Sequence, residues 1–248
     1  MTRFLLGYIP EHTTYAEPFA GGAKLLFAKE PSKIEILNDM DDNLVNLYRI
    51  IQNSEKRQKL INFLNETPFS RSIFRAWKYG NETTPDDIEK AARYFYLCRA
   101  SFAGDVHRGG FACPSKGTGR NPAQTFRTSI ETFESVAKRL RNVTIECLDY
   151  ADCIRRYDSP GSLFYVDCPY YGSEFRYGNT FTERDHYTLS DILHSIKGKA
   201  MVSHYQCDTY NQLYHDWQRY EYLSFKGSHK SIGGETKPRT KENIFINW

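Results

Sequence analysis

The hydrophobic positions at the start of the chain predict a strand, a helix and a second strand. Residues 15–19 form an apolar run that breaks at Gly21 and Gly22 and resumes with helical spacing over residues 23–27. A short strand is predicted over residues 34–37. A strand, a helix and a strand at this spacing form one βαβ unit, which predicts neighbouring parallel strands in a sheet.

The middle of the chain has a helical pattern. Apolar residues recur every three or four positions in three stretches, which cover residues 44–51, 60–64 and 86–98. Asp86 follows Pro85, and acidic residues in a first turn are typical of a helix start. Residues 101–122 are rich in glycine and in basic residues, which predicts a hairpin or an ordered loop. Another amphipathic helix is predicted over residues 133–140.

Strand patterns return in the last part of the chain. The predicted strands there cover residues 143–147, 163–166, 200–203 and 244–246, with a helix over about 183–196. The whole pattern predicts an α/β fold with a doubly wound, Rossmann-like sheet. We expect residues 1–50 and 136–248 to form the sheet domain and residues 51–135 to form a helical insertion.

Composition adds few constraints. The 248 residues carry a formal net charge of +3, a mild basic bias that is compatible with nucleic acid. The 18 tyrosines and 16 phenylalanines suit base stacking and equally suit a packed core. None of the six cysteines has CxxC spacing, so we expect reduced thiols and no metal site. Without a signal peptide or a membrane-length apolar stretch, we expect a soluble cytoplasmic protein with no membrane partner.

The first candidate site is the glycine turn at residues 17–23. Glycines between a strand and a helix let the main chain approach a ligand, and ligands of doubly wound sheets lie beyond the carboxyl ends of the strands. The turn lacks both GxGxxG and the P-loop pattern, so neither a dinucleotide nor a P-loop nucleotide is favoured. A tight turn with no ligand would also explain the two glycines.

Asp39 strengthens the binding interpretation. It ends the next strand, about twenty residues after the glycine turn, where an acidic side chain can accept hydrogen bonds from both hydroxyls of a ribose. The alternative is that Asp39 or Asp41 caps the helix beginning near Asn43. We expect Asp41 or Asp42 to cap the helix and Asp39 to bind the ligand.

The second candidate site is Asp167-Cys168-Pro169-Tyr170, directly after a buried strand. Together with EPFAGGA at 17–23, it resembles the motifs of the Dam-like (D12-class) adenine-N6 DNA methyltransferases. The segments 96–104 and 109–114 resemble the hairpin of that family, and 36–39 and 241–246 are similar as well. The motifs occur in the family's order, and the resemblance spans roughly residues 15–248.

The resemblance implies an enzyme that transfers a methyl group from S-adenosylmethionine (AdoMet) to N6 of adenine in double-stranded DNA. It implies an AdoMet-dependent methyltransferase sheet with a helical target-recognition insertion, base flipping, direct in-line transfer, and a place among restriction–modification enzymes. The residues that it assigns to AdoMet are Glu17, Pro18, Phe19, Ala20, Gly21, Gly22, Asp39, Asp149, Tyr150 and Asp167. A helix cap is an equal alternative for Asp149.

The chemistry explains the need for such a tetrad. The lone pair of N6 is delocalised into the adenine ring, so a carboxylate and a main-chain carbonyl that accept from the amino group free it for attack. Asp167 would supply the carboxylate and Cys168 the carbonyl. Pro169 would stiffen the loop and Tyr170 would stack on the flipped base. No nucleophilic role is expected for the Cys168 thiol, because attack on the ring belongs to cytosine-C5 enzymes.

DNA contacts are expected from the insertion, on a hairpin at about residues 99–116. Cationic side chains on a projecting ribbon can anchor phosphates, and an arginine can read a guanine edge. The candidates are Arg99, Ser101, His107, Arg108 and Lys116, with Arg120 beside them. A solvated surface loop is the alternative for each of these. A second basic run could touch the DNA backbone and comprises Lys226, Lys230, Lys237, Arg239 and Lys241.

Two features depart from the family pattern. Cys168 replaces the usual proline, which affects the rigidity of the loop. The usual Gly-Gly-Lys segment upstream of the glycine turn is not found before Glu17, so either the start is truncated or other groups hold the methionine end of AdoMet.

Three alternatives stay open at this point. Cytosine-N4 methylation uses the same amino-group chemistry, although enzymes of that type commonly have Ser in place of Asp167. A catalytically weak relic that binds DNA or AdoMet is the second, and RNA or protein as the substrate is the third. A monomer meets all the demands of the expected mechanism.

Overall fold

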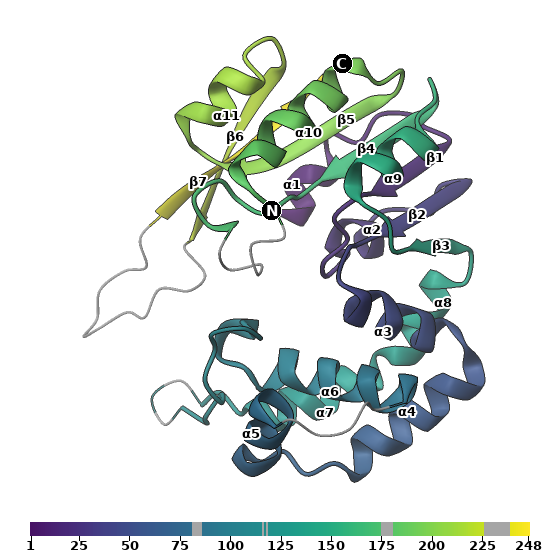
Figure 1. Ribbon diagram of the computed structural model, residues 1–248, viewed down its shortest axis with the longest axis vertical. Coiled ribbons are helices and arrows are strands. Elements are labelled where there is room, and N and C mark those ends of the chain that lie inside the picture. The colour runs from purple at the N-terminus through teal and green to yellow at the C-terminus, as the bar shows by residue number, and fades with distance from the viewer. Residues whose placement is uncertain (81–85, 116, 118, 175–180, 226–238) are drawn as a thin grey trace. The chain divides into compact units, whose positions relative to one another are not determined.

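The computed structural model describes residues 1–80, 86–115, 117, 119–174, 181–225 and 239–248. Figure 1 shows its elements along the chain. The strands are β1 (Thr14–Glu17), β2 (Ile34–Asn38), β3 (Val143–Glu146), β4 (Ser162–Val166), β5 (Lys199–Tyr205), β6 (Gln218–Phe225) and β7 (Arg239–Ile246). The α-helices are α1 (Thr2–Leu6), α2 (Lys24–Ala28), α3 (Asp42–Gln52), α4 (Ser54–Glu66), α5 (Arg71–Tyr79), α6 (Asp87–Ala100), α7 (Pro122–Glu131), α8 (Phe133–Leu140), α9 (Tyr150–Tyr157), α10 (Glu183–Ser195) and α11 (Asp208–Leu213), and η1 (Phe102–Gly104) is a 3-10 turn.

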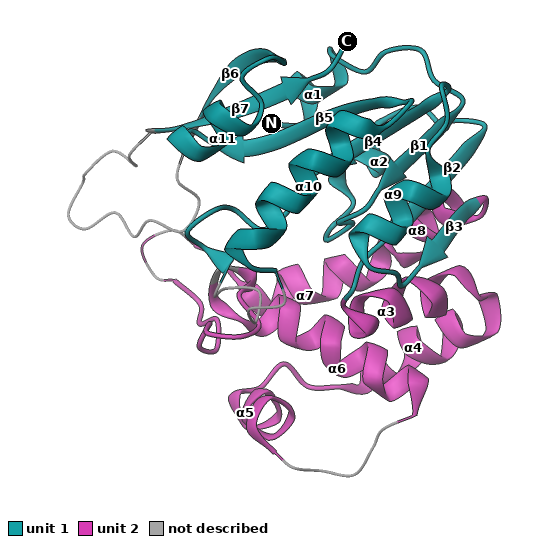
Figure 2. Ribbon diagram, turned by 45° about the horizontal axis from the view of Figure 1, so that its top comes forward, with its two compact units in different colours: residues 1–40, 143–248 teal, residues 41–142 magenta. Residues whose placement is uncertain are grey.

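The chain divides into two compact units (Figure 2). Unit 1 comprises Met1–Met40 and Val143–Trp248, and unit 2 comprises Asp41–Asn142. The division differs from the boundaries expected at residues 50 and 136. Helices α3 and α8 fall in unit 2 because α3 packs against α4, α6 and α8.

Unit 1 is built on a seven-stranded sheet in the order β3-β2-β1-β4-β5-β7-β6. The first five strands of this order are parallel to one another, as the βαβ pattern predicts. Their order, 3-2-1-4-5, is that of a Rossmann-type sheet. Strand β7 runs antiparallel to both β5 and β6, so the sheet is mixed rather than wholly parallel. The predicted α/β, Rossmann-like fold class is confirmed.

The centre of this sheet is apolar, which explains why its strands form. All five residues of β4 are buried, and Leu163, Phe164 and Val166 are fully buried. A run of this kind is typical of a parallel strand covered on both faces. Helices α9, α10 and α11 cover one face of the sheet, where their side chains share a core with Phe164 and Val166 (Figure 1).

The order of the strands determines where a site can form. Strands β1 and β4 are neighbours, yet the chain leaves them toward opposite sides of the sheet, to β2 and to β5. This is the topological switch point at which doubly wound sheets bind ligands. The glycine turn follows β1 and the Asp167 loop follows β4, so both candidate sites end at the same edge of the sheet.

Unit 2 is helical, as predicted for the insertion. Several of its helices begin at a side chain that accepts a hydrogen bond from a main-chain N–H of the first turn. These N-caps are Asp41, Asn53, Ser70, Asp86 and Asn121. Asp41 therefore caps α3, which confirms that prediction and leaves Asp39 outside the capping role.

Candidate functional site

The glycine turn after β1 is open on its outer side. Gly21 has φ +46°, a value that favours glycine, and a Cβ placed there would meet no atom within 4 Å. Gly21 N donates to Asp39 Oδ2 across 2.9 Å, and Ala20 N donates to Asn38 O across 2.8 Å. The end of β2 therefore holds the turn, and the Asp39 carboxylate lies beside it.

Glu17 acts inside the protein at this turn. It is 1% exposed, and its Oε1 accepts hydrogen bonds from Tyr15 Oη at 2.7 Å and from Leu26 N at 2.9 Å. Burial raises the pKa of Glu17 to about 8, although both hydrogen bonds oppose this shift. These contacts join β1 to α2. The predicted contact between Glu17 and AdoMet stays a prediction.

Asn38 joins the ends of three neighbouring strands. The side chain is fully buried, and its Nδ2 donates to Pro18 O at 2.9 Å and to Leu148 O at 3.0 Å. Its Oδ1 accepts from Leu148 N at 2.8 Å. In the sequence, Asn38 stands out only as part of the 36–39 segment. An amide side chain at the end of an apolar strand is the signal that could have indicated a bridging residue.

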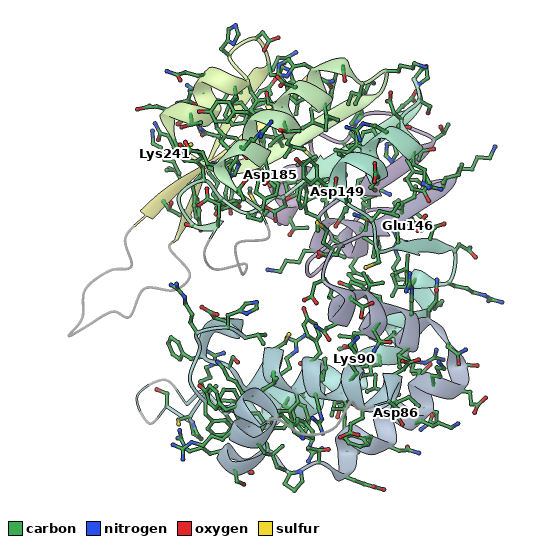
Figure 3. The ribbon with its side chains drawn as sticks, in the orientation of Figure 1. Asp86, Lys90, Glu146, Asp149, Asp185 and Lys241 are labelled. Atoms are coloured by element: carbon green, nitrogen blue, oxygen red, sulfur yellow. The ribbon has the colours of Figure 1, made fainter. Side chains whose placement is uncertain are left out.

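Asp149 (Figure 3) caps α9, which begins at Tyr150 beyond the end of β3. The Asp149 side chain accepts from Ala151 N at 2.8 Å, so it is the helix cap that the sequence allowed as an alternative. Tyr150 is 5% exposed, and its hydroxyl lies 3.2 Å from Asp185 Oδ1. Its ring stacks on Phe19, with centroids 5.4 Å apart. The contact between Asp149 and AdoMet stays a prediction.

Asp167 directly follows β4, and its side chain is accessible to solvent. Its Oδ1 accepts from Ser203 Oγ at 3.0 Å. Protein atoms nevertheless crowd around the carboxyl group, and the resulting desolvation raises the pKa of Asp167, while hydrogen bonds from Ser203 and Tyr170 favour the ionised form. The carboxylate is thus more basic than an ordinary aspartate and is held in one orientation.

Cys168 is 1% exposed, and its Sγ lies 3.0 Å from the hydroxyl of Tyr210. Burial raises the pKa of the Cys168 thiol to about 12, so it stays protonated at neutral pH. Both facts agree with the expectation that the thiol is not a nucleophile. Tyr170 is half-buried, and its ring lies against Tyr205 and His204, with centroid distances of 4.4 Å and 4.9 Å.

These residues suit AdoMet chemically. AdoMet carries a sulfonium, an ammonium, a ribose diol and an adenine amino group, all of which favour hydrogen-bond acceptors or negative charge. The carboxyl edge of the sheet presents carboxylates at the ends of β2, β3 and β4, from Asp39, Asp149 and Asp167. The open face of Gly21 lies at the end of β1 among them. The carboxylate acceptors and the open main chain at Gly21 therefore fit these groups of AdoMet.

A cavity of about 860 Å³ elsewhere in unit 1 does not belong to this site. It is lined by Lys29, Ser32 and His12, among others, and lies near residues that precede β1 and β2. Lys29 is buried there in an ion pair with Glu35, at 2.6 Å, and also donates to Ser32 Oγ at 2.6 Å. Lys29, Ser32 and His12 have protein partners, and the cavity lies at the opposite end of the strands from the glycine turn.

In unit 2, residues 101–111 form an ordered loop closed by an antiparallel bridge between Ser101 and Phe111. Phe102 N donates to Gly110 O at 2.7 Å. Helix α5, which was not predicted, supports the loop from one side. Lys78 Nζ donates to Gly109 O at 2.6 Å, and the guanidinium of Arg71 lies 5.0 Å from the ring of Phe111.

The predicted DNA contacts differ in exposure. Arg99, His107 and Arg108 are exposed on or beside this loop. Ser101 is 3% exposed, and its Oγ has no hydrogen-bond partner within the part of the chain that the structure describes. The contact between Ser101 and DNA stays a prediction. Lys116 lies outside the described residues.

The second basic run is described only in part. Lys226, Lys230 and Lys237 lie outside the described residues. Lys241 is on β7 and lies 3.1 Å from Glu221 Oε2, so it takes part in a surface ion pair (Figure 3). Among the described residues, no helix is long and apolar enough to cross a membrane.

The model of one family, described as D12 class N6 adenine-specific DNA methyltransferase, matches residues 1–227. The chain belongs to this family. The enzyme is therefore an adenine-specific DNA methyltransferase, and the family implies AdoMet as the methyl donor.

Curated relatives of the methyltransferase carry names of the same kind. Type II methyltransferase M.CviBI of Paramecium bursaria Chlorella virus NC1A is 28% identical over 87% of this chain and 82% of its own length. Type II methyltransferase M1.LlaDCHI of Lactococcus lactis subsp. cremoris is 26% identical over 84% and 78%. DNA adenine methylase of Serratia marcescens is 24% identical over 96% and 90%. Family and relatives favour adenine over the cytosine-N4 alternative.

Proposed function

We propose that this methyltransferase binds AdoMet at the carboxyl ends of β1, β2 and β3 and transfers the methyl group to N6 of an adenine held at Asp167. The observation that carries the proposal is the meeting of the two motif loops at the switch point between β1 and β4. One loop offers an open glycine backbone, and the other offers an accessible carboxylate held by Ser203.

The AdoMet side of the site uses main chain and acceptors. Gly21 lets the backbone approach the ligand without a Cβ in the way. Asp39 would accept from the ribose hydroxyls, in addition to its hydrogen bond from Gly21 N. Phe19 and Tyr150 provide an aromatic wall, and Asp149 would approach the adenine amino group of AdoMet.

The base side of the site prepares the nucleophile. Asp167 and the main-chain oxygen of Cys168 would accept hydrogen bonds from the two N6 hydrogens. This draws the amino group toward tetrahedral geometry and directs its lone pair at the methyl carbon. AdoMet would supply the methyl group: a bond from N6 to the methyl carbon would replace the bond from that carbon to sulfur, and the Asp167 carboxylate or water would take one N6 proton. The raised pKa of Asp167 suits a group that stabilises the positive charge on N6.

Tyr170 would stack on the target adenine, which must leave the duplex to reach the loop. In unit 2, we propose that Arg99, His107 and Arg108 contact DNA phosphates or base edges, supported by the ordered loop 101–111. Double-stranded DNA is thus the proposed partner, and contacts through exposed cations imply binding that weakens as salt rises.

The test of this assignment is Asp167→Ala. We expect kcat for methyl transfer to fall by about a thousandfold, because a carboxylate aimed at developing charge is lost. Binding of AdoMet, measured by isothermal titration, should stay within a few-fold of the wild type. Asp152→Ala, an exposed aspartate of α9, is the matched control and should leave both quantities unchanged. Normal turnover of Asp167→Ala would disprove the assignment.

A further inference from the structure

His204 is a buried histidine in β5 that the proposed mechanism does not use. Its side chain is 1% exposed. Tyr171 N donates to His204 Nε2 across 2.8 Å, and Nδ1 lies 2.6 Å from Tyr205 O. A backbone N–H can only donate and a carbonyl can only accept, so Nε2 is unprotonated and Nδ1 carries the proton. The two contacts therefore select one neutral tautomer of the ring.

The neutral form is also the one that burial favours. Desolvation lowers the pKa of His204 to about 4, although the hydrogen bond to the carbonyl of Tyr205 works in the opposite direction. A doubly protonated ring would point an N–H at the N–H of Tyr171 and lose that contact. At neutral pH the ring is thus a fixed acceptor for the main chain of the loop.

The same ring is part of a brace behind the Asp167 loop. It stacks on Tyr210, with centroids 3.6 Å apart and planes 15° from parallel. Tyr210 Oη lies 3.0 Å from Cys168 Sγ, and the ring of Tyr170 lies 4.9 Å from that of His204. His204 and Tyr210 together contact the second, fourth and fifth residues of the loop that begins at Asp167.

The residue before His204 holds the start of the loop. Ser203 Oγ donates to Asp167 Oδ1 at 3.0 Å. Successive residues of a strand point to opposite faces of a sheet. Strand β5 therefore holds the loop from both faces, with Ser203 at the carboxylate and His204 at the main chain of Tyr171. These contacts hold a loop in which Cys168 lacks the fixed φ of a proline.

We propose that His204 is a positioning residue for methyl transfer, whose neutral ring fixes the main chain of residues 167–171 in the geometry that methyl transfer requires. The inference rests on the proposed roles of Asp167 and Tyr170. His204 touches none of the reacting atoms, and it acts through the hydrogen bond from Tyr171 and through its contact with Tyr170.

A pair of amide substitutions tests the role of Nε2. In His204→Asn the amide lies near the position of Nδ1, so the acceptor for Tyr171 N–H is lost. In His204→Gln a carbonyl oxygen can reach the position of Nε2 and accept from it. The matched control is His194→Asn, because His194 lies on α10 of the same unit and contacts Asp216 instead. The substrates are unmethylated duplex DNA and AdoMet, with thermal unfolding as the check of folding.

We expect His204→Asn to lower kcat by about tenfold to a hundredfold, as for a small misplacement of reacting groups. The Kd for AdoMet and the KM for DNA should stay within a few-fold. His204→Gln should recover most of the rate, and His194→Asn should match the wild type. Equal losses in His204→Asn and His204→Gln, or a loss confined to AdoMet binding, would overturn the proposal.

Two further measurements test the proposal even if a variant does not fold. Nitrogen NMR of the labelled wild-type protein reports the tautomer directly, even where a variant does not fold. A proton on Nε2 of His204 would overturn the proposal, and a proton on Nδ1 alone supports it. Asp167→Ala, assayed in parallel, distinguishes a failure of the role proposed for His204 from a failure of the proposed function. If Asp167→Ala is inactive while His204→Asn is normal, the positioning role alone fails.

Discussion

The two loops that meet at the switch point are built in different ways. The turn after β1 is held from the inside by buried groups, Glu17 and Asn38, and leaves the backbone at Gly21 open. The loop after β4 is held from the sheet side by Ser203 and His204, and it presents the Asp167 side chain itself. A main-chain turn that binds a cofactor must leave space for it. A residue that orients a reacting nitrogen must have its side chain fixed in one geometry.

The strongest test of this contrast on the AdoMet side is Asn38→Ala. It would leave the buried carbonyl of Pro18 and the partly buried main chain of Leu148 without their partners, so we expect a loss of roughly 3 kcal/mol of unfolding free energy. AdoMet affinity should also fall by about tenfold or more, because the turn loses its support. Denaturant unfolding and isothermal titration measure the two effects. Asn62→Ala, an exposed asparagine of α4, should change stability by less than about 0.5 kcal/mol.

Glu17→Gln tests whether the buried carboxyl supports the turn or contacts AdoMet. With a folded pKa of about 8 against an ordinary value of 4.5, Glu17 is protonated in the native state while the unfolded chain ionises. Wild-type stability is full below pH 4.5 and falls as pH rises toward 8, by up to about 1.4 kcal/mol per pH unit.

Glutamine cannot ionise, so the variant should lose this slope and gain stability relative to the wild type at pH 8. Its AdoMet affinity should stay within a few-fold. Unfolding measured between pH 5 and pH 8.5 checks the slope, with the exposed Glu66→Gln as the control. A large loss of AdoMet affinity would assign Glu17 to the ligand.

Gly21→Ala tests the open backbone. The positive φ should cost about 1 kcal/mol of stability, and the new Cβ would project into the open space above the turn and weaken AdoMet binding several-fold. Gly7→Ala, at the end of α1, is the control, since Gly7 has φ −70° and a Cβ there would meet only Phe4 O at 3.4 Å. Equal AdoMet affinity in the two variants would contradict a backbone-lined site.

The smallest effect is expected for Cys168→Pro. The substitution removes the contact between Cys168 Sγ and Tyr210 but restores the fixed φ of a proline, so the two changes oppose each other. We expect kcat to rise modestly or stay unchanged, by less than about threefold or 0.6 kcal/mol. Cys168→Ala removes the thiol without adding stiffness and is the comparison variant. A large loss in both would reveal a role for the thiol.

Much of the fold follows from local patterns. The buried strand before Asp167, the βαβ unit at the start and the capped helix at Asp86 each carry their own signal. Strand β6 was missed because QRYEYLSF mixes polar and aromatic residues at an edge of the sheet. Helix α5 was missed as well, since its nine residues bury only Phe74.

In the candidate site, only the residues of the two sequence motifs could be predicted. Asp167 and Gly21 carry the chemistry in short segments, so their positions could be inferred. The contacts of Ser203 and His204 join residues more than thirty positions apart and depend on the register of β4 and β5. No local pattern encodes such a pairing, because it arises when two strands meet.

In the proposed mechanism, the Asp167 loop presents adenine N6 to AdoMet. Transfer of tritium from labelled AdoMet to unmethylated duplex DNA, followed by digestion to nucleosides and chromatography, tests it most directly. We expect label in N6-methyladenosine from the wild type and about a thousandfold less label from Asp167→Ala. Label in N4-methylcytosine, or equal label in RNA or protein, would contradict the assignment, as would no transfer by a folded protein that binds AdoMet.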